Sequence, residues 1–222
     1  MVRPLIDVYF IGCYFGTGEW EASVQVGSCK PTQNIILIVS LIPFHIRFWQ
    51  CINRFYETKM WFPHLVNGGK YLASILMLVM AYFRNTTPGY DQTYLLIGIF
   101  STCYSYAWDL YMDWGLLRGT KPGQRLLRDR LKFPPHYYYF SIITNLLLRL
   151  TWLIAFIPPS AYPQIMQRTD MMFFFLALGE CYRRAQWSLF RVENENVNNF
   201  EKYRSIMEIP KLPDDYQNGQ SY

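Results

Sequence analysis

Five long apolar windows in a chain of 222 residues constrain the fold more than any other feature of this sequence. A run of about 20 predominantly apolar residues can cross the hydrocarbon core of a bilayer as an α-helix. Buried helices of soluble proteins can imitate one or two such runs, but five in succession favour a membrane protein. The windows cover residues 34–50, 64–83, 93–115, 137–158 and 171–190.

These windows predict an all-α fold, a polytopic transmembrane helical bundle with five full spans. A further apolar run over residues 5–15 is too short to span a bilayer and is expected to belong to a partial N-terminal helix. The predicted transmembrane domain covers residues 1–208. The polar sequence from Glu193 onward is expected to fray, and residues 209–222 are expected to form a disordered tail.

Basic residues predict the orientation of the bundle. Cytoplasmic loops of membrane proteins carry an excess of Lys and Arg, and the loop after the third window holds six basic residues against one acid, Asp129. We therefore place this loop in the cytoplasm and attribute the net charge of +5 to topology, not to nucleic-acid binding. Tyr137, Tyr138 and Tyr139 fit an aromatic belt at the membrane interface. The six basic residues are Arg118, Lys121, Arg125, Arg128, Arg130 and Lys132.

The cysteine and histidine pattern gives no sign of a metal or redox centre. The cysteines show no C-x-x-C spacing and the histidines are scattered, so we expect neither a metal ion nor a cofactor. A disulfide between Cys13 and Cys29 is compatible with an outer location of both, but unpaired thiols are favoured. The carboxylates of Asp109 and Asp113 have no accompanying nucleophile or metal set, so an enzyme is not expected.

Charged residues inside the windows carry most of the functional information, because an ionisable group in the hydrocarbon core is costly unless it faces a cavity or a partner. Asp109 and Asp113 are four residues apart and therefore share a helix face. Arg149 has only uncharged neighbours for at least seven residues on either side, and Glu180 shares a face with Arg183. The full set is Lys70, Asp109, Asp113, Arg149, Glu180, Arg183 and Arg184.

The basic members of this set outnumber the acidic ones by four to three. Charges in a sealed core pair to neutrality, because an unmatched buried charge is strongly destabilising. An excess of arginine instead suits a mobile anion, since the planar guanidinium binds a tetrahedral oxyanion through two parallel hydrogen bonds. Tyr71 would add a hydroxyl donor, and Trp152 a bulky ring able to narrow a path.

Five of these seven charges have an alternative, structural interpretation, whereas Arg149 is the hardest to explain in this way. Asp109 and Asp113 could cap the cytoplasmic end of a span. Arg183 and Arg184 could extend their charged ends to the membrane interface while their stems stay in lipid. Lys70 could be an interfacial residue.

Five strings in the chain resemble a known family. They are R-F-W-Q-C-I-N-R-F from Arg47, F-P-H-L-V-N-G-G-K-Y from Phe62, Y-S-Y-A-W-D-L-Y-M-D-W-G-L-L from Tyr104, L-R-L-T-W from Leu148 and E-C-Y-R-R-A-Q-W-S-L-F-R-V-E-N-E-N-V-N-N from Glu180. The chain resembles the EXS domain, the C-terminal membrane module of the SPX–EXS phosphate exporters (xenotropic and polytropic retrovirus receptor-like proteins). The likeness covers about residues 5–208, and W-D-L-x-M-D-W-G together with F-R-x-E-N-E is its most specific part.

The resemblance implies export of inorganic phosphate through a path among helices in the lipid bilayer. It implies that Trp152 acts as a gate, that Glu180 holds an arginine, and that Arg47 is a basic residue on the cytoplasmic side. By matching position, the phosphate-binding residues would be Lys70, Tyr71, Arg149, Arg183 and Arg184, with Asp109 and Asp113 as acids beside the path.

A second function stays open. The polar residues that the family carries early in its first EXS helix, and its regulatory SPX domain, would lie before Met1, and Met60 stands where a basic residue is usual. The alternative is a non-transporting EXS-only protein in Golgi sorting or retention, or an inactive fragment of a longer exporter. The expected location is the plasma membrane or the Golgi, and a homodimer is a candidate assembly.

Overall fold

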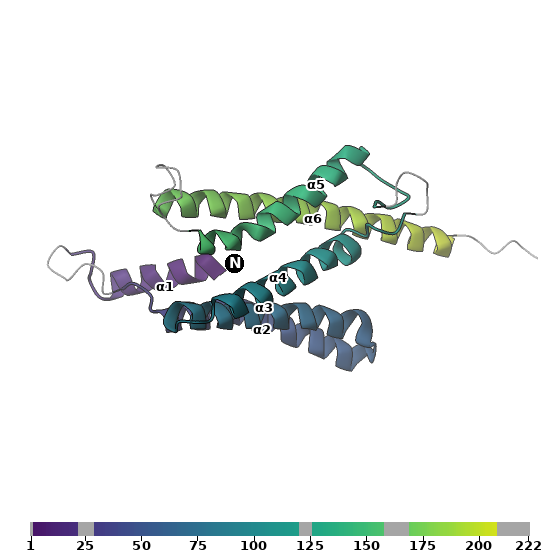
Figure 1. The fold of residues 1–222 in the computed structure, drawn as a ribbon. Coiled ribbons are helices and arrows are strands. Elements are labelled where there is room, and N and C mark those ends of the chain that lie inside the picture. The colour runs from purple at the N-terminus through teal and green to yellow at the C-terminus, as the bar shows by residue number, and fades with distance from the viewer. Residues whose placement is uncertain (1, 22–28, 120–125, 158–168, 208–222) are drawn as a thin grey trace, which may run out of the picture. The chain divides into compact units, whose positions relative to one another are not determined.

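The computed structural model describes residues 2–21, 29–119, 126–157 and 169–207, which form helices and loops with no strand (Figure 1). The all-α prediction is therefore confirmed for these residues. The chain divides into two compact units, Met1–Ser105 and Tyr106–Tyr222. The elements in chain order are α1 (Val2–Gly16), α2 (Gln33–Thr58), α3 (Trp61–Thr86), α4 (Asp91–Trp108), η1 (Asp109–Asp113), α5 (Pro135–Arg149), η2 (Leu150–Phe156) and α6 (Thr169–Met207).

In the first unit, α2 and α3 pack side by side as a helical hairpin (Figure 1). The Thr32 hydroxyl accepts a hydrogen bond from the Ile35 amide at 3.5 Å and caps the start of α2. Lys59 adopts a left-handed backbone with φ of 57° and ends α2. By length and composition, α2 and α3 are each long and apolar enough to cross a bilayer.

A close approach between α3 and α4 depends on a glycine. The Tyr104 hydroxyl of α4 donates a hydrogen bond of 2.5 Å to the Val66 carbonyl of α3. A methyl group at Gly69 would lie only 2.9 Å from that hydroxyl oxygen. The contact fixes the turn of α3 that carries Lys70 and Tyr71.

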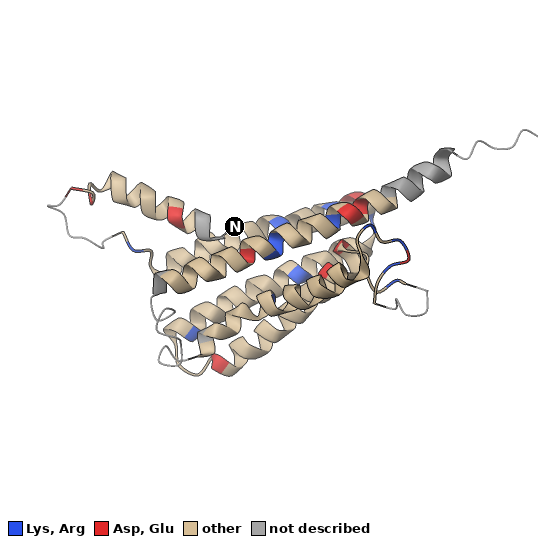
Figure 2. Cartoon of the chain, turned by 90° about the horizontal axis from the view of Figure 1, so that it is seen from above, with Lys and Arg blue, Asp and Glu red and all other residues tan. Residues whose placement is uncertain are grey.

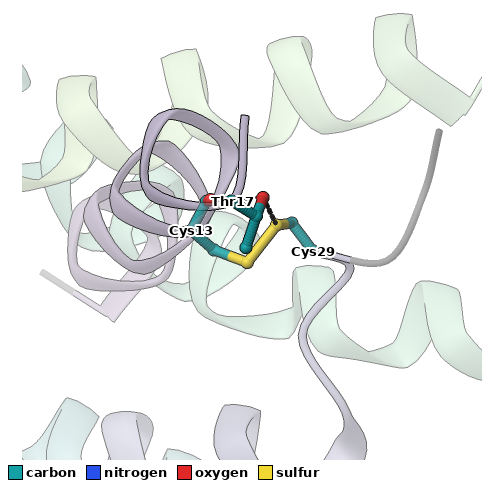
Figure 3. Close-up of a disulfide and its surroundings, with 3 residues drawn as sticks. All are labelled: Cys13, Thr17 and Cys29. Carbon is teal, nitrogen blue, oxygen red and sulfur yellow. Dashed lines mark hydrogen bonds between the residues drawn. A yellow bond between two sulfur atoms is a disulfide. The ribbon is translucent and has the colours of Figure 1, made fainter. Parts of the chain in front are cut away.

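A disulfide joins Cys13 of α1 to Cys29, which precedes α2 (Figure 3). Cys29 is fully buried, and the Thr17 hydroxyl lies 3.5 Å from its sulfur (Figure 3). The preference for unpaired thiols at these two positions was therefore wrong. Sequence spacing did not reveal the pair, because the two cysteines are 16 residues apart and only the folded chain brings their Cα atoms to 5.6 Å.

In the second unit, the third apolar window does not end as a regular α-helix. After α4, η1 is a π-helical turn in which the Trp114 amide donates to the Asp109 carbonyl at 2.8 Å. Such turns are frequent at functional sites. α5 ends at Arg149, and the 3₁₀ helix η2 begins at the next residue. The core of the unit is built from Leu110, Trp114, Leu116, Leu127, Tyr138 and Phe190.

Two sequence predictions about this unit were wrong. α6 continues to Met207, and Glu193 and Asn194 are buried, so the segment expected to fray begins as packed helix. Tyr138 is 1% exposed and belongs to the core, not to an interfacial belt. Periodicity could not reveal either fact, because these residues are held by partners distant in sequence. The expected tail over residues 209–222 lies outside the described residues.

Candidate functional site

Asp109, at the start of η1, binds two side chains of α5 that are one helical turn apart. Arg149 donates to Oδ2 of Asp109 through Nε at 3.1 Å and through Nη2. Asn145 donates to the same Oδ2 through Nδ2 at 3.1 Å. Asp109 is 3% exposed and Asn145 is fully buried. Arg149 is therefore held through a single carboxylate oxygen, which it shares with Asn145.

Glu180 of α6 binds the two arginines that follow it. Arg183 makes a two-pronged contact, with Nε 2.8 Å from Oε2 and Nη2 2.8 Å from Oε1. Nε of Arg184 lies 2.7 Å from Oε1. The side chains of Glu180 and Arg184 are 41% and 52% exposed, whereas that of Arg183 is 11% exposed. The Glu180 carboxylate thus pairs with two guanidinium groups and is itself partly exposed to solvent.

These two groups form the arginine cluster, defined here as Asp109, Arg149, Glu180, Arg183 and Arg184. The two parts lie on neighbouring turns of α5 and α6, because a methyl group at Gly179, next to Glu180, would lie only 3.1 Å from Cδ2 of Leu148, next to Arg149. Three cations against two anions leave one positive charge in excess. Such a cluster can accept an oxyanion, since a guanidinium fork exchanges one set of oxygen acceptors for another of the same geometry.

Asp113 has partners different from those of Asp109. Its Oδ2 accepts a hydrogen bond from Nε1 of Trp187 at 3.1 Å, and its Oδ1 lies 3.5 Å from Nη1 of Arg191. Arg191 also lies over the Trp187 ring, 5.1 Å from its centroid. Sequence spacing predicted a shared face for the two aspartates, but it could not show that each binds a different arginine.

The other predicted site residues lie on η2, α3 and α2. Trp152 lies in η2, with its ring centroid 6.2 Å from that of Phe156. In the first unit, the Lys70 ammonium lies 4.9 Å from the centroid of the Tyr71 ring. Arg47 of α2 donates to Oε1 of Gln50 at 3.2 Å. Gating and phosphate binding by these residues stay predictions.

Sequence reasoning missed a second cluster, the Glu193 cluster, which consists of Arg128, Tyr138, Glu193 and Asn194. The Glu193 Oε1 accepts from the Tyr138 hydroxyl at 2.5 Å and from the Lys132 amide at 3.0 Å. Nη2 of Arg128 lies 2.5 Å from the same oxygen, and the two side chains are 8% and 2% exposed. Arg128 therefore belongs to a buried ion pair, although its loop position indicated only an exposed topology charge.

Asn194 ties this cluster to the end of η1. Its Nδ2 donates to the carbonyls of Met112 at 3.3 Å and Asp113 at 3.1 Å, and its Oδ1 accepts from Arg128 at 3.2 Å. Gly115 has φ of 62°, and a methyl group there would lie 2.2 Å from the same Oδ1. The string F-R-V-E-N-E could have indicated this cluster. Glu193 and Asn194 follow apolar Phe190 by three and four residues, so they lie on the same face of the helix as a residue expected to be buried.

The second unit also carries a basic groove of about 430 Å³, lined by Arg130, Lys132, Asn196 and Val197. Arg130 and Lys132 are both exposed. α6 carries no charged residue over positions 171–179, and acidic and basic residues recur along it from Glu180 onward (Figure 2). No group of three or more His, Cys, Asp or Glu side chains could hold a metal ion in the parts of the chain that the structure describes.

Comparison with known proteins decides the family. Residues 1–197 match the sequence pattern of the EXS family. The chain belongs to the EXS family. The resemblance carried by W-D-L-Y-M-D-W-G and F-R-V-E-N-E is thereby confirmed. These two EXS strings are in contact in the second unit, because Asn194 of the second string donates hydrogen bonds to the carbonyls of Met112 and Asp113 in the first.

Several EXS relatives match almost the whole chain. Human solute carrier family 53 member 1 is 33% identical over 228 residues, which cover 94% of this chain and 33% of the human protein. A xenotropic and polytropic retrovirus receptor 1 homolog from Xenopus laevis is 34% identical, with 94% and 32% of the two chains covered. The corresponding homolog from Danio rerio is 33% identical, with 96% and 33% covered. The chain thus spans about a third of the length of these relatives.

Proposed function

We propose that this EXS domain carries inorganic phosphate across a membrane, and that Arg149, Arg183 and Arg184 bind the anion on its path. The arginine cluster is the observation that carries the proposal, because its three guanidinium groups share two carboxylates. A structural ion-pair set would gain most from neutrality. An excess positive charge is what a passing anion requires.

The contacts within the arginine cluster differ in a way that would let phosphate replace a carboxylate at Arg149. Arg183 uses both oxygens of Glu180, whereas Arg149 uses only Oδ2 of Asp109. A phosphate offers two oxygens to a guanidinium fork and can therefore replace the single-oxygen contact at Arg149 with a better one. The acids limit the net attraction, so that the anion can leave as well as enter.

The remaining residues extend the proposed path. Lys70 and Tyr71 would form a further phosphate-binding position on α3, and Arg47 would act on the cytoplasmic side. Trp152 would gate the path by moving its ring. The basic groove at Arg130 and Lys132 would raise the local concentration of phosphate, because like charges lining a concave surface attract counter-ions.

We further propose that the chain is multi-pass, with all five apolar windows as spans, in the plasma membrane or the Golgi. The disulfide supports this orientation independently of the basic residues. Structural disulfides persist in oxidising compartments and are rare in the cytosol. Cys13 and Cys29 lie on the side of the predicted topology opposite to the basic loop. Exposed aliphatic residues on α2 and α3, such as Ile38 and Leu72, suit contact with lipid.

Phosphate efflux from sealed vesicles that contain the chain tests the proposal. We expect Arg149→Ala to abolish efflux, because the anion loses its fork, and Arg183→Lys to weaken it, because an ammonium cannot make two parallel hydrogen bonds. Arg54→Ala is the matched control, since Arg54 pairs with Glu57 at 70% exposure and should keep full efflux.

Two results would overturn the proposal. Efflux that is unchanged in Arg149→Ala would remove the arginine cluster from the path. No efflux from the unaltered chain, together with co-purification of Golgi enzymes, would favour the alternative of a non-transporting protein in Golgi sorting.

A further inference from the structure

Asn145 carries a buried hydrogen-bond acceptor with no partner in the described part of the chain. The side chain is fully buried, and its Nδ2 donates to Asp109 at 3.1 Å, but its Oδ1 accepts no hydrogen bond from any residue that the structure describes. A buried polar atom without a partner is rare and destabilising. An acceptor of this kind lies beside the cluster proposed to bind an anion, so it can accept a hydrogen bond from an anion that carries a donor.

The neighbouring carboxylate dictates which way the Asn145 amide points. With the amide reversed, its carbonyl oxygen would face Oδ2 of Asp109, and two acceptors would repel each other. The nitrogen must therefore face Asp109, which leaves the oxygen unpaired. Arg149 does not relieve it in this arrangement: its Nε and Nη2 both donate to Asp109, and Oδ1 of Asn145 accepts no hydrogen bond from its guanidinium.

We propose that Oδ1 of Asn145 selects oxyanions that carry a hydroxyl group, with hydrogen phosphate as the substrate. This inference rests on the proposed phosphate transport and adds the chemical basis of its selectivity. Nδ2 of Asn145 and Nε of Arg149 are each 3.1 Å from one oxygen of Asp109. An anion that takes the place of this carboxylate at Arg149 therefore arrives beside the Asn145 amide.

The edges of hydrogen phosphate and of a carboxamide are complementary. A P–O⁻ oxygen accepts from the amide N–H, while the P–O–H group donates to the amide carbonyl, and the remaining oxygens face the Arg149 fork. Sulfate and other oxyanions without a hydroxyl group present acceptors alone. They would leave Oδ1 unpaired and bring a negative oxygen against it. Sites built to hydrogen-bond a substrate hydroxyl reject analogues that lack it for this reason.

Fluorophosphate tests the inference on the unaltered chain. At mildly alkaline pH it is a dianion like hydrogen phosphate, but fluorine replaces the hydroxyl group and no donor is left. In sealed vesicles we expect it to compete with phosphate efflux about tenfold less well than arsenate, which keeps a hydroxyl group. Equal competition by fluorophosphate and arsenate would overturn the inference.

Asn145→Leu provides the second measurement. We expect this change to lower phosphate efflux and to reduce the preference for arsenate over fluorophosphate by about tenfold. Gln186→Leu is the matched control: Gln186 is a buried amide of the same unit that bonds Ser141 at 3.0 Å and Thr144 at 3.0 Å. This control should keep the preference of the unaltered chain.

The outcomes separate the two proposals. Phosphate efflux without a preference between the two analogues would leave transport standing and overturn the role of Asn145. Absence of any efflux from the unaltered chain would overturn the proposed transport itself. Because the fluorophosphate comparison needs no variant, it stays decisive even if Asn145→Leu fails to fold.

Discussion

A methyl group at Gly115 would lie 2.2 Å from Oδ1 of Asn194, although the two residues are far apart in the sequence. Asn194 bonds the last carbonyls of η1 and the guanidinium of Arg128. The space left by the missing side chain at Gly115 thus lets one amide of α6 hold the end of the π-helical turn. Since η1 begins at Asp109, this contact also helps to fix one end of the arginine cluster.

Gly115→Ala is therefore expected to lower the free energy of unfolding by more than backbone strain alone. A non-glycine residue with left-handed backbone costs about 1–2 kcal/mol, and here Asn194 must move as well. Gly89→Ala separates the two effects, because Gly89 has φ of 95° and no atom within 4 Å of a built methyl group. Thermal unfolding in detergent would measure both variants. Equal losses would show that the contact with Asn194 has no energetic role.

Glu193→Gln should destabilise the second unit strongly. Removing one charge of a buried pair leaves the other uncompensated, which costs about 3–5 kcal/mol, and Arg128 would be left in that state. Glu57→Gln offers a control at the surface, because the Arg54–Glu57 pair is exposed, and such pairs contribute at most about 1 kcal/mol. Chemical denaturation of both variants tests this. Similar midpoints for the two would contradict the buried pair.

Asp109→Asn should make phosphate bind more tightly and leave more slowly. The amide keeps the size of the carboxylate but removes the charge that offsets Arg149. We expect the half-saturating phosphate concentration to fall by about tenfold, equivalent to about 1.4 kcal/mol, together with a lower maximal efflux rate. Asp91→Asn breaks the pair with Arg84, in which Asp91 is 65% exposed, and should change neither value. A higher half-saturating concentration in Asp109→Asn would refute this role.

The disulfide should be detectable from one side of the membrane only. After mild reduction, a membrane-impermeant maleimide added to the outer side is expected to label Cys13 and Cys29, because both lie opposite to the basic loop in the predicted topology. Cys13→Ser should lower the free energy of unfolding by about 3 kcal/mol, the value for a closed loop of this length. Labelling from the cytoplasmic side alone would invert the orientation proposed above.

Periodicity and the cost of charge in an apolar segment predicted a large part of the arginine cluster. Arg149 and Glu180 were identified because each lies in a long apolar window. Asn145 was missed, since a single amide in a span is unremarkable until its carboxylate partner is known. Arg128 was assigned to an exposed loop, because burial depends on Glu193, which lies 65 residues later.

The sequence by itself determined the helices and the membrane class, because apolar runs and their spacing are local properties of the chain. It also determined the family, since W-D-L-Y-M-D-W-G and F-R-V-E-N-E are strings that can be read directly. Only the tertiary structure decided which acid each arginine binds, how η1 ends, and which acceptor is left without a donor. Hydrogen bonds and ion pairs act over a few ångströms in space, and residues distant along the chain reach that range only when the helices pack.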